Sequence, residues 1–179
     1  MAGAGMKAIK TRIASVNSTK QITNAMHLVA SSKLRKAKKA AEDSSEYFNT
    51  LYETIVDISI NTKGVRSEFL VSKELKKRCH IVIAGDRGLA GGYNSNAFKE
   101  AEKYMGRVED CVIPIGKKAC DYFAKRNIEI IDKIDLVEEY SYEDVKRIAD
   151  EVMKRFIDGE ISEVLLTYTQ FISALTQEA

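Results

Sequence analysis

The first sixty residues carry apolar side chains at steps of three and four positions. The apolar positions that share this spacing are Ile9, Ile13, Val16, Ile22, Met26, Val29, Ala30, Leu34, Ala37, Ala41, Phe48, Leu51, Ile55 and Ile58. The spacing is that of an amphipathic α-helix with a seam of the coiled-coil type. No proline and no glycine after Gly5 interrupts it. A continuous helix over about Met6–Ile60 would be roughly 80 Å long at 1.5 Å per residue.

The seam of this helix is incomplete. Thr19 and Thr23 interrupt it, and many other seam positions hold only alanine. A narrow stripe of small residues lets another helix approach closely, but it offers too little apolar area to stabilise an isolated helix in water. We therefore expect the helix to pack against a partner.

The period of the pattern changes beyond residue 60. Asn61–Ser72 is predicted to be a flexible link with a turn at Gly64. Short apolar runs then predict strands at Cys79–Ala84, Cys111–Ile115, Ile128–Ile131 and Glu163–Phe171. The stretches between the strands predict helices over 95–105, over 117–126, and from the capping pair Ser141 and Asp144 to Phe156.

Strands that alternate with helices indicate βαβ units and a mostly parallel sheet. The predicted fold class is therefore α/β: a long N-terminal helix of the coiled-coil type, followed by a Rossmann-like domain in the order βαβαβαβ. We divide the chain into a helix over residues 1–60, a linker over 61–76 and an α/β domain over 77–179.

Composition indicates the compartment in which this fold is expected and argues against insertion into a membrane. Hydrophobic residues make up 45% and charged residues 30% of the chain. No apolar run reaches the roughly 18 residues of a membrane-spanning helix, so we expect no membrane insertion, and no secretory signal is recognisable at the start. Cys79, Cys111 and Cys120 form no C-x-x-C pair, which predicts buried thiols in a reducing compartment and argues against a zinc site.

Charge is distributed unevenly along the chain. Residues 1–41 contain nine Lys and Arg and no Asp or Glu. A solvated face is the usual explanation of a lysine-rich helix, but so one-sided a charge predicts an anionic partner. Nucleic acid is one candidate, although no aromatic residue precedes Tyr47 for base stacking. Acidic protein surfaces are the other. A transit peptide is disfavoured because lysine outnumbers arginine seven to two.

A glycine-rich turn follows the first predicted strand, with glycines at positions 85, 88, 91 and 92. Such a turn before a helix can surround a phosphate with backbone N–H groups. The spacing is neither G-x-G-x-x-G nor that of a G-K-[ST] loop, so we favour a tight structural turn in which Asp86 and Arg87 pair locally. A nucleotide- or phosphate-binding α/β protein with a helical oligomerisation arm is the main alternative.

Catalytic arrangements have little support elsewhere in the chain. His80 adjoins a predicted buried strand and His27 lies on the basic helix, so both are expected to be structural or interface residues. The carboxylates of Asp132–Glu139 are expected to form a solvated loop. We predict no catalytic residue, no cofactor and no metal.

Three segments of the chain resemble the gamma subunit of F-type ATP synthases. The run IKTRIASVNSTKQITNAMHLVASSKLRKAKKA, residues 9–40, is similar to the N-terminal signature of that family. GDRGLAGGYNSN, residues 85–96, is similar to its turn after the first strand, and YTQFISALTQEA, residues 168–179, to a third family motif. The motifs occur in the order of the family and extend over nearly the whole chain.

The resemblance implies a central-stalk (rotor) subunit of a proton-translocating F-type ATP synthase, which couples ion-driven rotation to conformational change in the alpha and beta subunits without being an enzyme itself. In that family an N-terminal and a C-terminal helix form a coiled coil inside a ring of alpha and beta subunits. The α/β domain lies against the epsilon subunit and the membrane c-ring. The resemblance therefore implies these partners, no nucleic acid and no bound cofactor. It also implies a peripheral place at the cytoplasmic face of a bacterial cell membrane.

The resemblance also suggests which residues meet other subunits. The candidate subunit-interface residues are Met26, Lys33, Arg35, Lys36, Asp86 and Arg87. Met26 matches a methionine of the family near the neck of the shaft, and the three basic residues that follow are candidates for contact with acidic loops of the beta subunit. The two residues of the glycine turn are candidates for an interface of the foot domain.

The chain departs from the family pattern in two places. Ala90 stands where many members carry cysteine, so no thiol role is expected there. The sequence stops at Ala179, whereas the family continues to a further strand and the long C-terminal helix. We therefore expect a foot domain that is incomplete relative to the family. The unpaired seam is expected to fold back on the α/β domain or to self-associate.

Overall fold

The computed structural model describes residues 2–61, 67–70, 73–173 and 176–179. The chain forms two compact units, Met1–Val65 and Arg66–Ala179. The described part of the first unit is one helix and the second is an α/β unit, so the predicted fold class is confirmed.

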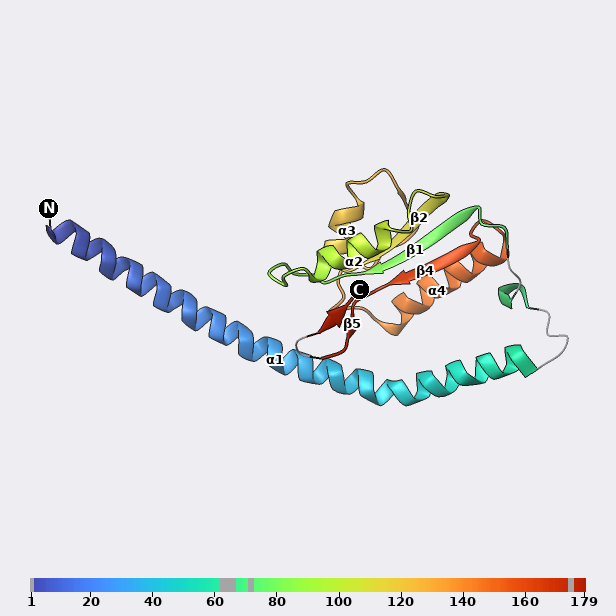
Figure 1. Cartoon of the computed structure of the whole chain (residues 1–179), viewed down its shortest axis with the longest axis horizontal. Coiled ribbons are helices and arrows are strands. Elements are labelled where there is room, and N and C mark those ends of the chain that lie inside the picture. The colour runs from blue at the N-terminus through green and yellow to red at the C-terminus, as the bar shows by residue number, and fades with distance from the viewer. Residues whose placement is uncertain (1, 62–66, 71–72, 174–175) are drawn as a thin grey trace. The chain divides into compact units, whose positions relative to one another are not determined.

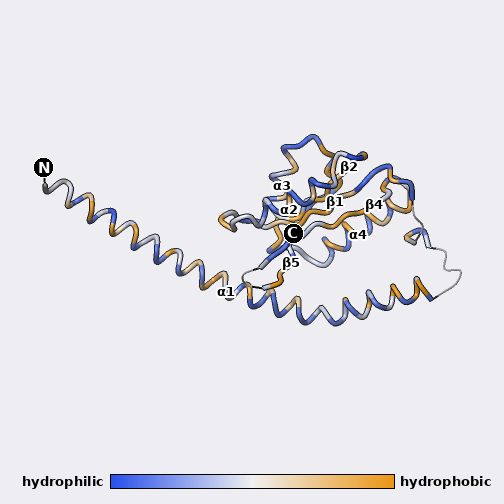
Figure 2. Tube along the Cα trace, in the orientation of Figure 1, coloured by the Kyte–Doolittle hydropathy of each residue, from blue (hydrophilic) through white to orange (hydrophobic). Residues whose placement is uncertain are grey.

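The helix of the first unit, α1 (Ala2–Asn61), runs without a break for 60 residues (Figure 1). At 1.5 Å per residue this corresponds to about 90 Å. Apolar and polar positions alternate along the whole helix (Figure 2). Of the α1 side chains that the structure describes, all but Val56 are exposed. The apolar seam therefore lies open to solvent.

The hydroxyl groups of the two threonines that interrupt the seam form hydrogen bonds within α1. Thr19 Oγ1 donates a hydrogen bond to the carbonyl oxygen of Ser15 at 3.0 Å, and Thr23 Oγ1 donates to that of Thr19 at 2.9 Å. A hydroxyl that is already bonded to its own helix leaves no unmet donor when the position is buried. The two threonines can therefore face an apolar helix at little cost.

The second unit is built on a parallel four-stranded sheet in the order β3-β2-β1-β4. Its strands are β1 (Lys77–Ile83), β2 (Glu109–Ile115), β3 (Glu129–Ile130) and β4 (Glu163–Thr167). The helices that follow the first three strands are α2 (Tyr93–Glu102), α3 (Lys117–Phe123) and α4 (Tyr142–Ile157). Figure 1 shows α4 on one face of the sheet and α2 and α3 on the other.

Two apolar cores lie on the two faces of this sheet. Because successive side chains of a strand point to opposite faces, neighbouring residues of β1 serve different cores. The core on the side of α4 contains Cys79, Cys111, Ile113, Ile134, Ile148, Val152 and Ile161. The core on the side of α2 and α3 contains Val82, Ala84, Phe98, Ala101, Val112, Ala119 and Phe123.

Two of the three cysteines, Cys79 and Cys111, are buried, and Cys120 is half-buried. Cys79 and Cys111 face each other in register on β1 and β2 and are fully buried. The hydrogen bond with Cys111, together with burial, raises the pKa of the Cys79 thiol. Burial raises the pKa of Cys120 to about 11. Protonated thiols are poor nucleophiles, so Cys79 and Cys120 have no reactive character at neutral pH.

His80 is fully buried on the opposite face of β1 from Cys79. Its Nε2 lies 2.9 Å from Oδ1 of Asp110, and Oδ2 of the same carboxylate accepts a hydrogen bond from the backbone N–H of Gly106 at 2.6 Å. The predicted structural role of this histidine agrees with its place in the core.

The predicted strand over Glu163–Phe171 is confirmed only over Glu163–Thr167, which is β4, and its extension to Phe171 is wrong. β4 ends at Thr167, which pairs with Val82, and the neighbouring strand β1 itself ends at Ile83. Since β1 continues no further, the ladder cannot extend, and the chain leaves the sheet. Gln170–Phe171 (β5) instead pairs with Gln177–Glu178 (β6) in a two-stranded antiparallel sheet that the sequence pattern did not predict.

The predicted flexible link is ordered in part. Glu68–Leu70 forms a single 3-10 turn, labelled η1, and the ring of Phe69 stacks on that of Phe156 at the end of α4, with ring centroids 5.7 Å apart. The ammonium group of Lys73 lies 3.9 Å from the centre of the same Phe156 ring. The predicted turn at Gly64 lies outside the described residues.

Candidate subunit interfaces

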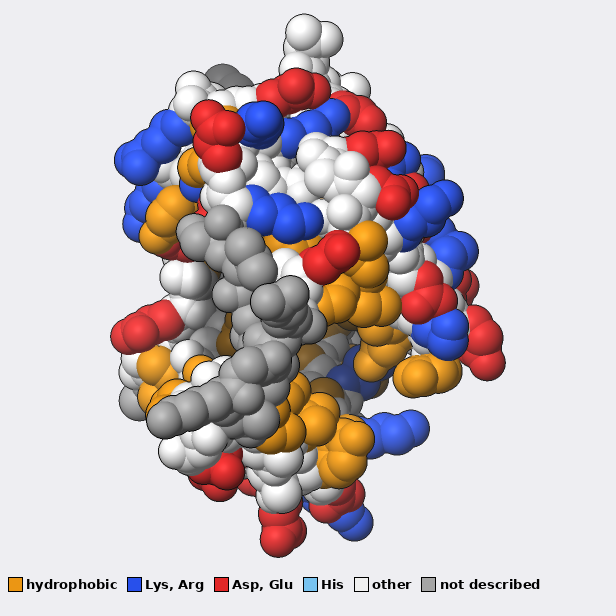
Figure 3. Space-filling view, turned by 90° about the vertical axis from the view of Figure 1, so that its right-hand side faces the viewer, with side chains coloured by type: hydrophobic (Ala, Val, Ile, Leu, Met, Phe, Trp, Pro, Cys, Tyr) orange, Lys and Arg blue, Asp and Glu red, His pale blue; other side chains and the backbone are white. Residues whose placement is uncertain are grey.

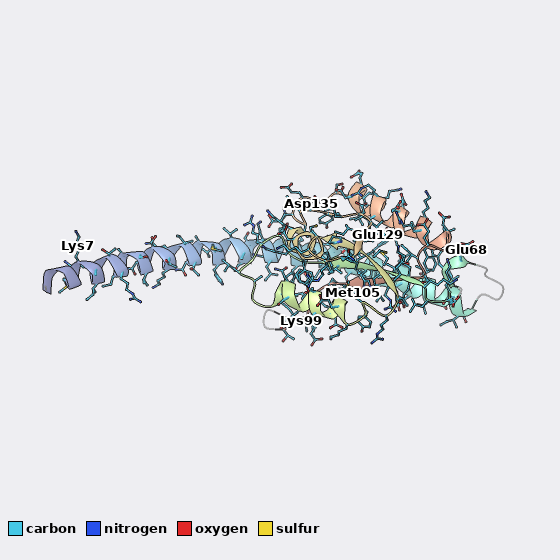
Figure 4. All side chains as sticks on the ribbon, turned by 90° about the horizontal axis from the view of Figure 1, so that it is seen from above. Lys7, Glu68, Lys99, Met105, Glu129 and Asp135 are labelled. Atoms are coloured by element: carbon cyan, nitrogen blue, oxygen red, sulfur yellow. The ribbon has the colours of Figure 1, made fainter. Side chains whose placement is uncertain are left out.

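The basic part of α1 is a candidate interface because its charge is of one sign. The nine Lys and Arg of residues 1–41 are all exposed. Figure 4 shows side chains projecting from both edges of this part of the helix as seen from above, where Lys7 is labelled. On the face shown in Figure 3, by contrast, acidic and basic side chains lie interspersed. A helix segment that carries only cations attracts anionic surfaces.

The remainder of α1 carries the opposite charge. Residues 42–61 contain five Asp and Glu and no Lys or Arg. The boundary is marked by an ion pair between Lys38 and Glu42, whose Nζ and Oε1 atoms lie 3.5 Å apart. This change of sign between residues 41 and 42 follows from the sequence alone. The two segments of α1 therefore suit partners of opposite charge.

The four predicted interface residues of α1 do not share one face. Lys33 follows Met26 by seven positions, which is about two turns, so the two side chains lie on the same side of the helix. Arg35 follows Met26 by nine positions, about 2.5 turns, and therefore lies on the opposite side. Lys36 lies between these two directions. The Met26 side chain is 55% exposed on the seam.

Asp86, in the glycine turn, is held by three backbone donors. Its Oδ1 accepts hydrogen bonds from the N–H of Lys117 at 3.1 Å and of Val137 at 3.0 Å, and its Oδ2 accepts from that of Glu138 at 3.1 Å. Although burial alone would raise the pKa of Asp86, these donors hold it below its ordinary value. The carboxylate thus ties the turn to the start of α3 and to the loop before α4.

The predicted local pairing of Asp86 with Arg87 is therefore wrong. The backbone N–H groups occupy the carboxylate of Asp86, and the guanidinium of Arg87 lies 3.7 Å from Glu138, between Nη2 and Oε2. The Arg87 side chain is 80% exposed. Of the two predicted residues, Arg87 is exposed enough to contact a partner, whereas Asp86 positions the turn.

Asn94 fastens the other end of the turn. Its Oδ1 accepts a hydrogen bond from the N–H of Gly85 at 2.8 Å, and its Nδ2 donates to the carbonyl oxygen of Arg87 at 3.2 Å. Between these anchors the turn presents Leu89, whose side chain is 97% exposed. Sequence reasoning missed this residue, because nothing in the pattern distinguishes an outward from an inward leucine in a glycine-rich turn.

A hollow of about 270 Å³ lies beside the turn and is lined in part by Gly92, Asn96 and Thr169. The preceding glycines do not follow a nucleotide-binding pattern, and the N-cap residue of α2, Gly92, provides no side-chain cap. Over the described residues, no group of three or more His, Cys, Asp or Glu could hold a metal ion. In that part of the chain no helix combines the length and the apolar character needed to cross a membrane.

An exposed helix seam, two charged segments and a turn that projects side chains are features typical of a protein that docks to other proteins. Comparisons with known proteins identify the family. A family described as "ATP synthase" matches residues 5–179. The ATP synthase gamma chain of Alkaliphilus metalliredigens is 42% identical over 178 residues, which covers 98% of this chain and 62% of that protein. The chain therefore belongs to the ATP synthase gamma chain family.

Two further comparisons describe the extent of the likeness. The sodium-ion-specific ATP synthase gamma chain of Acetobacterium woodii is 41% identical over 173 residues, covering 96% of this chain and 57% of that protein. The chain thus spans about three fifths of the length of these curated relatives. A central-stalk chain of the Tetrahymena thermophila mitochondrial ATP synthase matches with a TM-score of 0.62 at 18% identity, covering 87% of this chain and 68% of that one. The last match concerns the fold alone.

Proposed function

We propose that this chain acts as the central-stalk, or rotor, subunit of an F-type ATP synthase. It couples ion-driven rotation to conformational change in the ring of alpha and beta subunits, and it performs no catalysis and binds no cofactor itself. The observation that carries the proposal is α1: a helix of 60 residues whose described seam is exposed and whose first 41 residues carry only positive charge. Membership of the gamma chain family supports it.

A continuous helix suits the transmission of rotation. Each backbone hydrogen bond links one turn of α1 to the next, so a torque applied at one end reaches the other without a hinge. When such a shaft turns inside a ring, it contacts each ring subunit differently. Differential contact with two conformations shifts the equilibrium between them. The rotor thereby redistributes binding energy among catalytic sites that lie on other subunits.

The charges suggest how the shaft is held. We propose that Lys33, Arg35 and Lys36 meet acidic loops of the beta subunit, while Met26 meets the ring at an apolar bearing surface. Because these basic residues point in different directions around α1, different ring subunits would meet different cations at one rotor angle. Such charged contacts raise the rate of association and fix the orientation of the shaft more than they raise its affinity for the ring.

The seam requires a second helix. Its small residues and its internally bonded threonines permit close packing. In the family, an antiparallel helix of the same subunit packs against this seam. Without a second helix, the seam is expected to pair with another copy or with an apolar surface. The α/β unit is proposed to face the epsilon subunit and the c-ring, at the cytoplasmic face of a bacterial membrane.

A binding experiment tests this proposal. The chain is immobilised and exposed in turn to a purified ring of alpha and beta subunits, to epsilon subunit and to c-ring; calorimetric titrations with ATP and with NAD run beside it. The rotor proposal expects binding to the ring and no specific binding of either nucleotide. Stoichiometric nucleotide binding without binding to the ring would instead favour the phosphate-binding alternative.

A further inference from the structure

One set of positions on α1 follows a strict seven-residue repeat from Met6 to Ile58. Steps of three and four residues alternate along it without exception, as in the contact line of a two-stranded coiled coil. We call this set the heptad stripe, and its members are Met6, Ile9, Ile13, Val16, Lys20, Thr23, His27, Ala30, Leu34, Ala37, Ala41, Ser44, Phe48, Leu51, Ile55 and Ile58.

The large apolar side chains of the heptad stripe are gathered at its two ends. The first four positions, from Met6 to Val16, and the last four, from Phe48 to Ile58, are all apolar, and each of these eight side chains is at least 44% exposed. The positions between them hold small or polar residues, with the single exception of Leu34. Both ends of the stripe therefore need an apolar cover.

A second copy of α1 supplies this cover when it runs antiparallel. If Ile9 of one copy lies level with Ile55 of the other, the repeat brings every position of the stripe level with another position of the stripe. The large residues then meet one another: Met6 with Ile58, Ile13 with Leu51 and Val16 with Phe48. Because the two copies are identical, each of these pairings occurs twice.

The middle of the stripe is compatible with the same arrangement. Thr23 lies level with Ala41, and its hydroxyl already donates to the carbonyl oxygen of Thr19 at 2.9 Å. Ser44 lies level with Lys20, and its hydroxyl donates to the carbonyl oxygen of Ala41 at 3.1 Å. These hydroxyls therefore bring no unmet donor into the contact. Lys20 and His27 remain polar positions on the stripe, which limits the stability of the pair.

The charges of α1 favour the antiparallel direction. In this register the acidic residues of 42–57 lie level with residues 7–22 of the second copy, whose charged side chains are all Lys or Arg. The five cations of residues 33–39 lie level with residues 25–31, which contain no Lys, Arg, Asp or Glu. In a parallel pair in register, the same five cations would face their own copies. Since like charges at close range repel, the charge pattern selects the antiparallel pair.

We propose that α1 binds α1 of a second copy of this chain as an antiparallel two-stranded coiled coil, with Ile9 level with Ile55. The pairing goes beyond the proposed rotor function, because it describes the chain outside an ATP synthase. It covers both apolar ends of the heptad stripe until another helix replaces the second copy. The rotor function does not depend on it.

Sedimentation equilibrium of the whole chain tests the pairing. The wild type should sediment as a reversible monomer–dimer mixture, and its helix content should fall on dilution, because a long helix without a partner loses tertiary support. Ile13→Ser removes an apolar contact that occurs twice in the dimer and should weaken dimerisation by about tenfold or more. The matched control Leu28→Ser changes a 70% exposed residue off the stripe and should stay within about twofold of wild type.

Disulfide trapping tests the direction and the register. Ile9→Cys alone, Ile55→Cys alone and their equimolar mixture are oxidised with glutathione disulfide, and the wild type reports any crosslink through the native cysteines. The antiparallel register predicts a covalent dimer in the mixture and none in either variant alone, because position 9 lies level with position 55. Equal crosslinking of Ile9→Cys alone would overturn the direction.

The sedimentation result decides the pairing itself. A wild-type chain that stays monomeric at about 100 μM, or that forms assemblies larger than a dimer, would overturn the proposal, as would equal dimerisation of Ile13→Ser and Leu28→Ser. Each of these results would leave the rotor function standing, because binding to the ring of alpha and beta subunits tests that function separately.

Discussion

Replacing Asp86 by asparagine removes the charge that holds the glycine turn and keeps the shape of the side chain. In the wild type, Oδ1 accepts two backbone hydrogen bonds and Oδ2 accepts a third, at 3.0–3.1 Å. The asparagine oxygen can keep the first two as neutral bonds, but its NH₂ group faces the N–H of Glu138, so one donor meets another. A bond to a charged acceptor is worth about 1.5–3 kcal/mol and a neutral one about 0.5–1.5 kcal/mol.

These values give the expected loss. Two bonds weakened by about 1 kcal/mol each and one bond to a charged acceptor lost, at about 2 kcal/mol, sum to about 4 kcal/mol. Because the carboxylate is partly solvated, water compensates some of this, and we expect a loss of about 2 kcal/mol in the free energy of unfolding. The assay is urea denaturation at pH 7 followed by tyrosine fluorescence, since the chain contains eight Tyr and no Trp.

The pH dependence of the free energy of unfolding gives a second test of the same three hydrogen bonds. The pKa of Asp86 in the folded state is held below its ordinary value of 3.8. The contribution of the carboxylate is therefore fully present well above pH 3.8 and is lost as the pH falls through the lower folded-state pKa. The difference in stability between wild type and Asp86→Asn should stay constant from pH 7 to about pH 5 and narrow below pH 4.

A matched control removes a carboxylate that has no such bonds. Asp121 is exposed on α3, and Asp121→Asn should change the free energy of unfolding by less than about 0.5 kcal/mol. If Asp86→Asn is as stable as Asp121→Asn at pH 7, or if the gap does not narrow below pH 4, the three hydrogen bonds do not hold the turn.

Two further changes test the fold and the basic segment. Gly116 has φ +94°, and a Cβ there would lie 2.1 Å from the carbonyl oxygen of Ala84, so Gly116→Ala should cost about 3 kcal/mol or more in urea denaturation. Gly106→Ala, at φ +79° in open space, should cost only about 1 kcal/mol; equal losses would refute the steric argument. The triple change Lys33→Glu, Arg35→Glu and Lys36→Glu should weaken ring binding about tenfold or more and flatten its salt dependence. The same reversal at Arg107, Lys125 and Lys154 controls for net charge, and equal weakening by both triples would exclude a specific contact of α1.

Periodicity accounts for most of the fold. The spacing of three and four residues predicts α1, because every turn of an unbroken amphipathic helix repeats this spacing. The apolar runs predict β1 and β2, because both strands lie between the two cores. The capping pair of α4 is also local: the N–H of Asp144 donates to Ser141 Oγ at 3.2 Å, and the N–H of Ser141 donates to Asp144 Oδ2 at 3.0 Å.

The features that the sequence did not predict depend on distant neighbours. β4 stops at Thr167 because β1 stops at Ile83, more than eighty residues earlier. Asp86 receives its hydrogen bonds from residues 31, 51 and 52 positions away. The exposure of Leu89 depends on how the turn is tied to α3. Residue types along the chain predict none of these contacts, and the resemblance to a family suggested the turn as a candidate interface without giving its geometry.

Met26 offers the most direct test of the rotor account. Residues 1–179 replace the matching part of the gamma chain of Alkaliphilus metalliredigens in a reconstituted synthase, and ATP-driven ion transport is measured per ATP hydrolysed. Met26→Lys places a charge on the exposed seam and should lower this ratio while the helix content stays unchanged. Leu28→Lys, which adds the same charge at a 70% exposed position off the seam, is the control and should leave the ratio near that of wild type. An unchanged ratio in Met26→Lys would contradict the assignment of α1 as the shaft that turns against the ring.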